Sequence, residues 1–283
     1  AETAQNGGMN MMKYPIHKDH KGRWVHTWVR QSSIKTGDMC MERLRSEMFN
    51  LVEDPNNDGA DLGTACHSAA EDVITSMMGG GKQMTLDDTY DAMEYYWDRL
   101  SPHVDNWHSY GTAEKASLNG RGKIKNWYEN VMPMITDPQG VEVDFNKILI
   151  EDDERVVYVR GTIDLVESHM LWDWKFPKAD YTRDRWQYDR WDVQSIAYTW
   201  AMGIPYFRFG VMHNKGWGTM DFLRNDSDYE WLRQKVASMC QYVENQTASV
   251  DTPWLLGDNG WWCSEKWCPN WTRCKGKSLE REE

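Results

Sequence analysis

One stretch of the sequence constrains the fold more than any other, because apolar and polar side chains alternate along residues 141–176. The stretch is VEVDFNKILIEDDERVVYVRGTIDLVESHMLWDWKF. Apolar residues that recur at every second position are typical of strands with one buried face. The stretch therefore predicts several strands of an antiparallel sheet.

Helical patterns lie on both sides of this stretch. We expect a helix after Ser32 or Ser33 that carries Cys40 and Met48, a polar loop over 50–63, and helices over 64–78, 87–100, 113–132 (broken near Asn119-Gly120), 185–202 and 226–246. Residues 207–224 predict one or two more strands. This order of elements predicts one α/β domain over 31–283, after an irregular segment over 1–30.

The composition excludes some classes of protein. The chain has 283 residues, which is long enough to bury a substantial core. Its net charge of −12 argues against a general nucleic-acid binder, although an acidic chain can still contain a local basic groove. The sequence has no run of about 18 apolar residues and begins with no apolar signal region. We therefore expect a soluble cytoplasmic protein with no membrane partner.

Two acids and a lysine lie at the end of the alternating stretch. Asp173 and Lys175 are two residues apart and share a face of their strand, and Asp164 belongs to the preceding strand. The connection at 168–170 is short enough for a hairpin turn. Such a hairpin would place Asp164 beside Asp173 and Lys175.

This cluster has two explanations. Converging carboxylates suit a hard divalent cation such as Mg²⁺ or Mn²⁺, which can activate water and stabilise charge on a phosphate. A cross-strand salt bridge on an exposed face would use the same residue types and contribute little. The three residues by themselves leave both explanations open.

The arrangement Gly161-x-x-Asp164 followed by Asp173-x-Lys175 resembles the core of the PD-(D/E)XK nuclease superfamily. The resemblance implies a restriction-endonuclease-like mixed sheet flanked by helices. Asp164 and Asp173 match the two acids, and Lys175 matches the lysine that positions the attacking water. The backbone carbonyl of Trp174 matches a further metal ligand.

Two more motifs resemble the RecB-like branch of this superfamily. LGTACH at 62–67 is similar to the G-T-x-x-H motif, which implies His67 as a metal ligand. QSIAY at 194–198 is similar to the Q-x-x-x-Y motif, and Gln194 and Tyr198 share a helix face at this spacing. In the family these two residues face the active site and the bound strand. Glu142 falls where RecB-like proteins often have a glutamate, and we rank it as an auxiliary residue.

The cysteines add a third resemblance. Cys40 and the run Cys263-x4-Cys268-x5-Cys274 resemble the one-plus-three arrangement of AddB-type nucleases and the iron–sulfur CRISPR-associated exonucleases. The resemblance implies a [4Fe–4S] cluster on these four residues, in a region formed by Cys40 and 260–275. The first gap holds four residues where the family has two, and structural zinc is the alternative. Cys66 and Cys240 are expected to be free, buried thiols.

Two segments mix cations with aromatic rings or glycines, a pattern that suits a nucleic-acid strand. Residues 178–191 contain Lys178, Arg183, Arg185 and Arg190 with Tyr181, Trp186, Tyr188 and Trp191. Residues 119–125 contain Arg121, Lys123 and Lys125. A solvated surface is the alternative for both segments.

The combined motifs imply a metal-dependent DNA exonuclease that acts on single-stranded ends, with a catalytic core over about 60–225. It would work in recombination, repair, CRISPR adaptation or phage DNA processing. The chain has no G-x-x-x-x-G-K-[ST] motif, so a helicase or another partner of that pathway would supply any unwinding. A DNA-end-binding adaptor with little cleavage and an RNA-processing nuclease are the alternatives.

Overall fold

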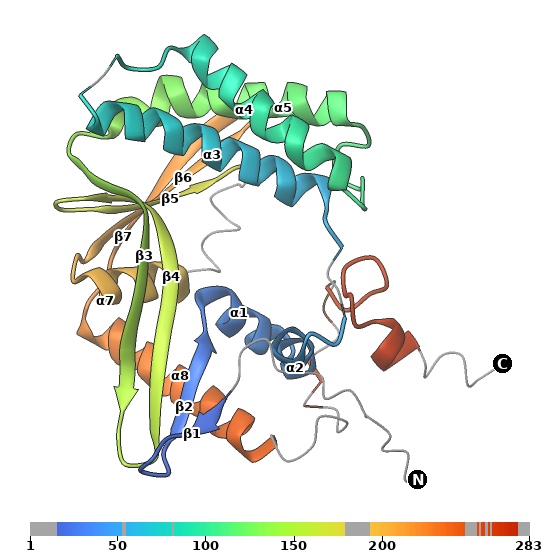
Figure 1. Cartoon of the computed structure of the whole chain (residues 1–283), viewed down its shortest axis with the longest axis vertical. Helices are drawn as coiled ribbons and strands as arrows, with labels where there is room; N and C mark the ends of the chain where they lie inside the picture. Colours follow the sequence, from blue (N-terminus) through green and yellow to red (C-terminus); the bar gives the residue numbers. More distant parts are fainter. Residues whose placement is uncertain are drawn as a thin grey trace, which may run out of the picture. The chain divides into compact units, whose positions relative to one another are not determined.

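The computed structural model describes residues 16–52, 55–80, 82–178, 193–246, 254, 256–257, 260 and 262–276 (Figure 1). They form an α/β fold with a mixed seven-stranded sheet flanked by helices, which confirms the expected fold class. The chain divides into two compact units. The first draws its residues from 1–54, 146–160 and 231–283, and the second from 55–145 and 161–230.

The sheet has a hydrogen-bonded path of six strands, and a seventh strand, β3, branches from it. The path runs through β1 (His17–Lys18), β2 (Trp24–Val29), β4 (Arg155–Glu167), β5 (Leu171–Lys175), β6 (Tyr206–His213) and β7 (Gly216–Leu223). β3 (Pro138–Glu151) pairs with β4. The pairs β2–β4 and β5–β6 are parallel, whereas β1–β2, β4–β5 and β6–β7 are antiparallel.

The strands expected over 141–176 and 207–224 are therefore confirmed. The expectation of an irregular segment over 1–30 is wrong for residues 17–29, because β1 and β2 lie there. β1 is only two residues long, and β2 has a polar His26 that is buried. Its pairing partner β4 is more than a hundred residues away in the sequence, so a local pattern does not reveal it.

In the first unit, two short helices replace the single expected helix. α1 (Gln31–Met39) and α2 (Met41–Phe49) are separated by Cys40, whose backbone is extended at φ −168° and ψ 116°. The last helix, α8 (Asp226–Gln246), has the bounds that the sequence predicts. Cys40 thus lies at a junction between helices and not within one.

In the second unit, three helices cover one face of the sheet. α3 (Asp58–Met78), α4 (Leu86–Leu100) and α5 (Ala113–Asn126) pack on one another beside β5 and β6 (Figure 1). Their apolar faces share a buried core with Trp172 and Trp174 of β5. Short helical turns complete the described chain: η1 (Ser101–His103), η2 (Trp127–Val131), η3 (Met132–Met134) and η4 (Thr272–Gly276).

α7 (Val193–Met202) lies within the helix that was expected over 185–202, and residues 185–192 lie outside the described part of the chain. The side chains of Gln194 and Tyr198 reach Asp173 and Phe207 of the sheet. Side chains alternate across a strand, so α7 contacts the face opposite Trp172 and Trp174. The described helices include none that is both long and apolar enough to cross a bilayer.

α5 runs through Asn119-Gly120, so the predicted break is wrong. A Cβ atom at position 120 would lie 2.9 Å from both Leu62 Cδ1 and Met93 Sδ. Gly120 therefore allows α3, α4 and α5 to approach one another closely, and the sequence pattern alone cannot separate this use of glycine from a helix break.

α3 begins six residues earlier than the expected helix, inside the predicted loop. The side chain of Asn57 accepts a hydrogen bond from the Ala60 N–H group at 2.9 Å and caps the helix. The carboxylate of Asp58, which is fully buried, accepts the backbone N–H groups of residues 109–111. Burial opposes ionisation of Asp58, but these three N–H groups lower its pKa.

Asp58→Ala should lower the free energy of unfolding by about 2–4 kcal/mol, because it leaves buried N–H groups without an acceptor. Urea unfolding at neutral pH measures this loss. Asp61→Ala on the same helical turn is the matched control. Burial, Asp105 and Asp58 raise the pKa of Asp61, so its removal should leave stability unchanged or raise it. Equal losses in the two variants would contradict the role assigned to Asp58.

Candidate active site and metal centre

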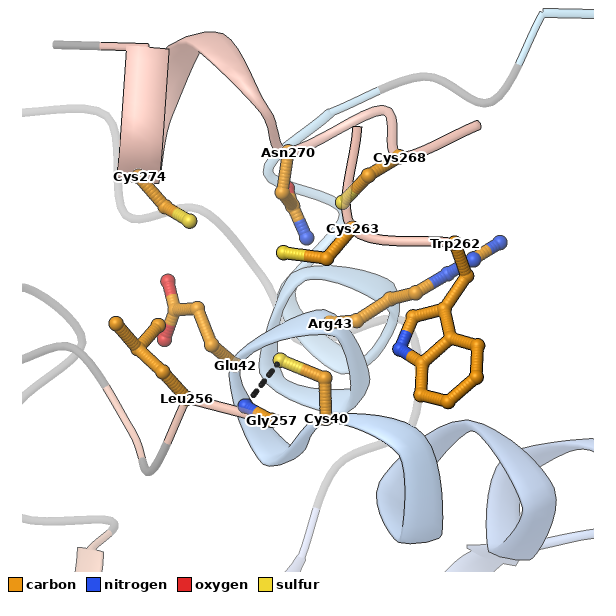
Figure 2. Close-up of a pocket in the computed structure, with 10 residues that line it drawn as sticks. All are labelled: Cys40, Glu42, Arg43, Leu256, Gly257, Trp262, Cys263, Cys268, Asn270 and Cys274. Atoms are coloured by element: carbon orange, nitrogen blue, oxygen red, sulfur yellow. Dashed lines mark hydrogen bonds between the residues drawn. The ribbon is translucent and has the colours of Figure 1, made fainter. Parts of the chain in front are cut away.

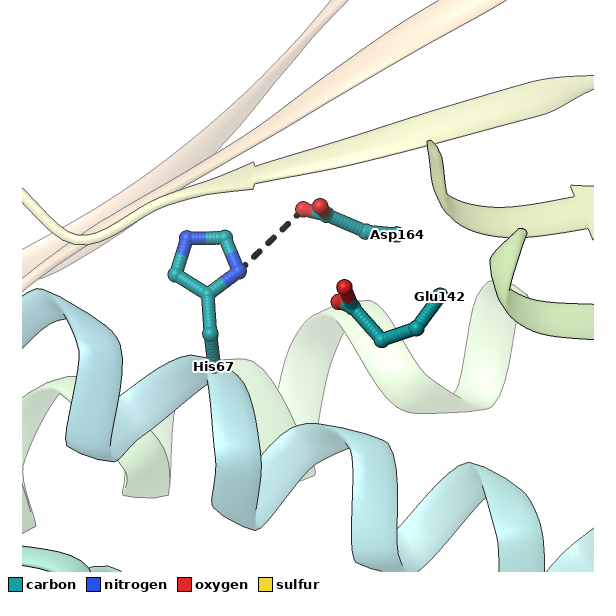
Figure 3. Close-up of side chains that lie close together, drawn as sticks. All are labelled: His67, Glu142 and Asp164. Atoms are coloured by element: carbon teal, nitrogen blue, oxygen red, sulfur yellow. Dashed lines mark ion pairs between the residues drawn. The ribbon is translucent and has the colours of Figure 1, made fainter. Parts of the chain in front are cut away.

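Three side chains from three elements of the second unit meet at one place (Figure 3). His67 projects from α3, Glu142 from β3 and Asp164 from β4. One potential ligand atom from each lies within 4.8 Å of the other two. His67 Nδ1 is 3.3 Å from Asp164 Oδ2, and 30% of the His67 side chain is exposed. One imidazole and two carboxylates form a donor set that suits a divalent cation.

The backbone aims Glu142 into this group. Its φ angle is 48°, in a region that non-glycine residues rarely adopt. Such conformations cost about 1–3 kcal/mol each and are concentrated at functional sites. From the sequence, Glu142 ranked as an auxiliary residue only, because its one signal was a position where RecB-like proteins often have a glutamate.

Burial and neighbouring charges shift the pKa values of two members of this group. Burial, followed by the nearby carboxylate of Asp164, raises the pKa of Glu142 to about 7. Burial alone would lower the pKa of His67, but Asp164 and Asp173 raise it above its ordinary value. The carboxylates thus favour the charged form of His67, whereas Asp164 disfavours ionisation of Glu142, and a bound cation would offset that repulsion.

The β4–β5 hairpin fixes Asp164 against the next strand. Leu165 pairs with Trp172, and the Glu167 N–H group donates to the Met170 carbonyl at 2.8 Å. Across this hairpin, the Trp174 N–H group donates to Asp164 Oδ2 at 2.6 Å. The short connection at 168–170 therefore forms the hairpin turn that the sequence predicts.

Asp173 is 2% exposed and lies between two partners. Lys175 forms an ion pair with it, and the Gln194 Nε2 group donates a hydrogen bond to its Oδ2 atom. Burial raises the pKa of Asp173, although the ammonium of Lys175 lowers it in part. The Lys175 side chain is 37% exposed and also lies 5.5 Å from the centre of the Phe209 ring. The ion pair with buried Asp173 and the contact with the Phe209 ring together orient the Lys175 ammonium, which is partly open to solvent.

Tyr198 has a different environment from Gln194. It is 4% exposed, and its ring contacts Phe145 and Phe207 at centroid distances of 5.4 and 6.1 Å. A Cβ atom at Gly161 would lie 3.0 Å from the Tyr198 ring. Gly161, the first residue of the G-x-x-D motif, therefore leaves room for this aromatic packing beside β4.

The structure thus brings His67, Asp164, Asp173, Lys175 and Gln194 into one compact unit. Among the described residues, the close metal-ligating group contains Glu142 and lacks Asp173. The assignment of Asp173 and of the Trp174 carbonyl as ligands stays a prediction.

The two predicted nucleic-acid segments differ in what the structure describes. Most of the first lies outside the described residues, and its Lys178 donates to the Ser109 carbonyl. In the second, Arg121 pairs with Glu94 at 2.6 Å, and Lys123 is 0% exposed. Lys123 therefore cannot contact a strand at the surface, and that part of the prediction is wrong.

In the first unit, four cysteines line one pocket (Figure 2). Cys40 comes from the α1–α2 junction, and Cys263, Cys268 and Cys274 come from the C-terminal segment. The Gly257 N–H group donates to Cys40 Sγ at 3.3 Å. None of the four forms a disulfide bond. Cys66 and Cys240 are buried elsewhere, and burial raises the pKa of Cys66 to about 12.

A buried ion pair on α2 also connects this helix to the C-terminal segment. Glu42 accepts hydrogen bonds from Arg45 at 2.8 and 2.5 Å, and both side chains are buried. The Glu42 carboxylate also accepts the Trp254 N–H group at 2.7 Å. A side chain at position 257 would clash with the Met39 carbonyl, because its Cβ atom would lie 1.9 Å away. Only glycine permits this approach to Cys40.

A mixed sheet flanked by helices, with acids and a lysine on adjoining strands, defines the restriction-endonuclease-like class of fold. The model of the PD-(D/E)XK nuclease superfamily matches residues 29–275. The chain belongs to this superfamily.

No curated protein matches the sequence. Among solved structures, the chain is similar to that titled "Crystal structure of SSO0001", with 14% identity and a TM-score of 0.35 over 49% of this chain and 60% of that chain. It is also similar to LHK-Exo in complex with dAMP, with 11% identity and a TM-score of 0.32 over 64% of this chain and 91% of that chain.

Glu142→Gln should alter the pH dependence of stability in metal-free protein. The folded state of the unsubstituted chain loses stability as pH rises from 4.5 to about 7, because it must give up the proton that the raised pKa retains. At about pH 8 the variant should be more stable by about 1–2 kcal/mol, a value reduced for solvent screening. At about pH 4.5 the two proteins should differ little.

Urea unfolding in the presence of a chelator measures this difference. Asp144→Asn changes an exposed acid two residues along β3 and is the matched control. Added Mg²⁺ should stabilise the unsubstituted protein more than Glu142→Gln. Parallel pH curves for the two proteins would show that neither burial nor Asp164 raises the pKa of Glu142.

Proposed function

We propose that this nuclease-family chain is a metal-dependent DNA exonuclease that hydrolyses phosphodiester bonds at single-stranded ends. The observation that carries the proposal is the meeting of His67, Glu142 and Asp164 in the unit that also holds the Asp173–Lys175 pair. A surface salt bridge would not explain why Asp164 and Asp173 are 8% and 2% exposed. Burying acids together is costly unless a cation or hydrogen bonds compensate.

His67, Glu142 and Asp164 would hold the cation, with Asp173 and the Trp174 carbonyl as further ligands. When bound, Mg²⁺ or Mn²⁺ supplies activation of water and neutralisation of charge on the phosphate. The donor set fits this role because the pKa of Glu142 is raised by burial and by Asp164. Nitrogen and carboxylate oxygen are both accepted by Mn²⁺, and Mg²⁺ prefers oxygen.

The remaining residues act on the water and on the transition state. Lys175 orients the attacking water and offsets the negative charge that develops on the phosphate. Asp173 holds the Lys175 ammonium, and Gln194 fixes the Asp173 carboxylate through its amide. Tyr198 supports α7 by packing on Phe145 and Phe207.

The substrate assignment rests on the family resemblance in the sequence. RecB-like nucleases act on free ends, and the chain has no P-loop motor motif of its own. We therefore propose a single-stranded DNA end as substrate and a helicase, recombination, CRISPR or phage protein as partner.

For the four-cysteine pocket we propose a [4Fe–4S] cluster held by Cys40, Cys263, Cys268 and Cys274. The environment of Asn270 shows whether the pocket lining suits such a cluster. Its side chain lines the pocket and is 3% exposed, and its Nδ2 atom has no hydrogen-bond partner among the described residues. A buried N–H donor of this kind suits the sulfur atoms of a cluster, as does the Gly257 N–H group at Cys40.

Zinc is the competing occupant of these cysteines. Tetrahedral zinc with Zn–S bonds of about 2.3 Å brings its thiolates to within about 3.8 Å of one another. Among the described residues, His67, Glu142 and Asp164 make up the group within 4.8 Å, and the cysteines do not. The wider spacing of the thiols supports the larger cluster.

Asp173→Ala and Lys175→Ala should each reduce cleavage by at least about 100-fold, because each removes charge from the reacting centre. The assay uses end-labelled single-stranded and double-stranded DNA and matched RNA, with Mg²⁺, Mn²⁺ or a chelator. Asp221→Ala on β7, an exposed acid paired with Arg208, is the control and should retain activity.

Full activity in either active-site variant would overturn the assignment of the site. Absent cleavage by the unsubstituted chain would favour an adaptor that binds DNA ends, and metal-independent cleavage would contradict the proposed metal chemistry. Faster cleavage of RNA than of DNA would favour an RNA-processing nuclease.

Anaerobically purified protein should be brown and contain about four irons per chain. Cys274→Ser should lose this iron, and Cys240→Ala, a buried thiol of the same unit outside the pocket, should keep it. Metal analysis and visible absorption measure both. Colourless protein with one zinc per chain would replace the cluster by a zinc site.

A further inference from the structure

Lys123 on α5 is a buried cation that the proposed chemistry does not use. It is 0% exposed, although it belongs to a sequence segment that resembled a basic surface. Burial lowers its pKa to about 8. Removing an ammonium from water costs several kcal/mol, and an apolar side chain of similar volume is often as stable or more so. Core packing alone therefore does not account for a lysine at this position.

The two partners of Lys123 indicate what it does. Its Nζ atom donates to the Tyr110 hydroxyl at 2.6 Å and to the Phe176 carbonyl at 2.7 Å. Both distances are typical of strong, charge-assisted hydrogen bonds. Phe176 directly follows Lys175, which is the last residue of β5 and pairs with Val211. Lys123 thus holds the backbone at the point where the chain leaves the strand.

Phe176 connects this contact to the metal-ligating group. It is 6% exposed, and its ring lies edge-on to the His67 ring at a centroid distance of 5.2 Å. Its carbonyl lies beyond the sheet ladder, where a buried polar group needs another partner. One residue therefore contacts His67 with its ring, is bonded to Lys175 through the backbone, and is held by Lys123.

Tyr110 anchors the other side of the ammonium. The Tyr110 N–H group donates to Asp58 at 2.5 Å, and Asp58 is the first residue of α3, the helix that carries His67. The start of α3, the segment at 109–111, Lys123 and the end of β5 therefore form one continuous hydrogen-bonded network. Every member lies in the second unit.

From this network we infer that Lys123 is a positioning residue, which sets the places of Lys175 and His67 by holding the Phe176 carbonyl. A shift of about 1 Å at a reacting group can cost about 100-fold in rate. The ammonium therefore acts on the reaction through the backbone and touches no substrate. This inference rests on the proposed nuclease function.

Two variants isolate the contact with Phe176. Tyr110→Phe removes the hydroxyl and leaves the bond from Lys123 to the carbonyl, so cleavage of single-stranded DNA should stay close to that of the unsubstituted chain. Lys123→Met combined with Tyr110→Phe removes that bond as well and leaves no orphaned hydroxyl. This double variant should lose about 10- to 100-fold in kcat, with KM for DNA unchanged.

A structural role alone would give a different result. Ile124→Ala, in the same buried core on the next residue of α5, should lower the melting temperature while keeping kcat. The double variant should lose kcat whatever its melting temperature. If Met is not tolerated at 123, Lys123→Gln in the Tyr110→Phe background keeps a shorter donor and should show a smaller loss of kcat.

The outcomes separate this inference from the function on which it rests. No metal-dependent cleavage by the unsubstituted chain would mean that the proposed function fails. Cleavage by that chain, with the double variant or its Gln counterpart as fast as Tyr110→Phe, would overturn the role of Lys123 alone. A loss confined to KM, or an equal loss in Tyr110→Phe, would overturn it as well.

Discussion

The second unit is organised around an unfavourable electrostatic arrangement. Asp164 and Asp173 are almost fully buried, and Glu142 and His67 complete the group around Asp164. Burial and the Asp164 carboxylate together raise the pKa of Glu142 to about 7, which shows the electrostatic cost of placing these acids close together. A fold that carries this cost in its interior is suited to binding a cation there.

The surrounding elements each constrain one part of the site. The β4–β5 hairpin fixes Asp164 through the Trp174 N–H group. α7 fixes Asp173 through Gln194, and Asp173 in turn holds Lys175. Directional hydrogen bonds from three elements leave the side chains few alternative positions, which is the condition for efficient catalysis by charged groups.

In the first unit, several contacts hold the C-terminal segment that carries three of the four pocket cysteines. The Glu42–Arg45 pair binds the Trp254 N–H group, and Gly257 allows close approach to Cys40. These contacts bring the four cysteines to one pocket. The proposed cluster would add metal–thiolate bonds between this segment and Cys40.

The sequence by itself determined the strands over 141–176, the bounds of α8, the hairpin that brings Asp164 to Asp173, and the family. Each depends on local periodicity or on motif order, which a linear chain records directly. The tertiary structure alone decided that Glu142 joins His67, that Lys123 is buried, that Gly120 packs between helices and that Asp58 starts α3. These depend on which faces meet and on what is removed from water, and for these residues neither local periodicity nor motif order identifies the partner.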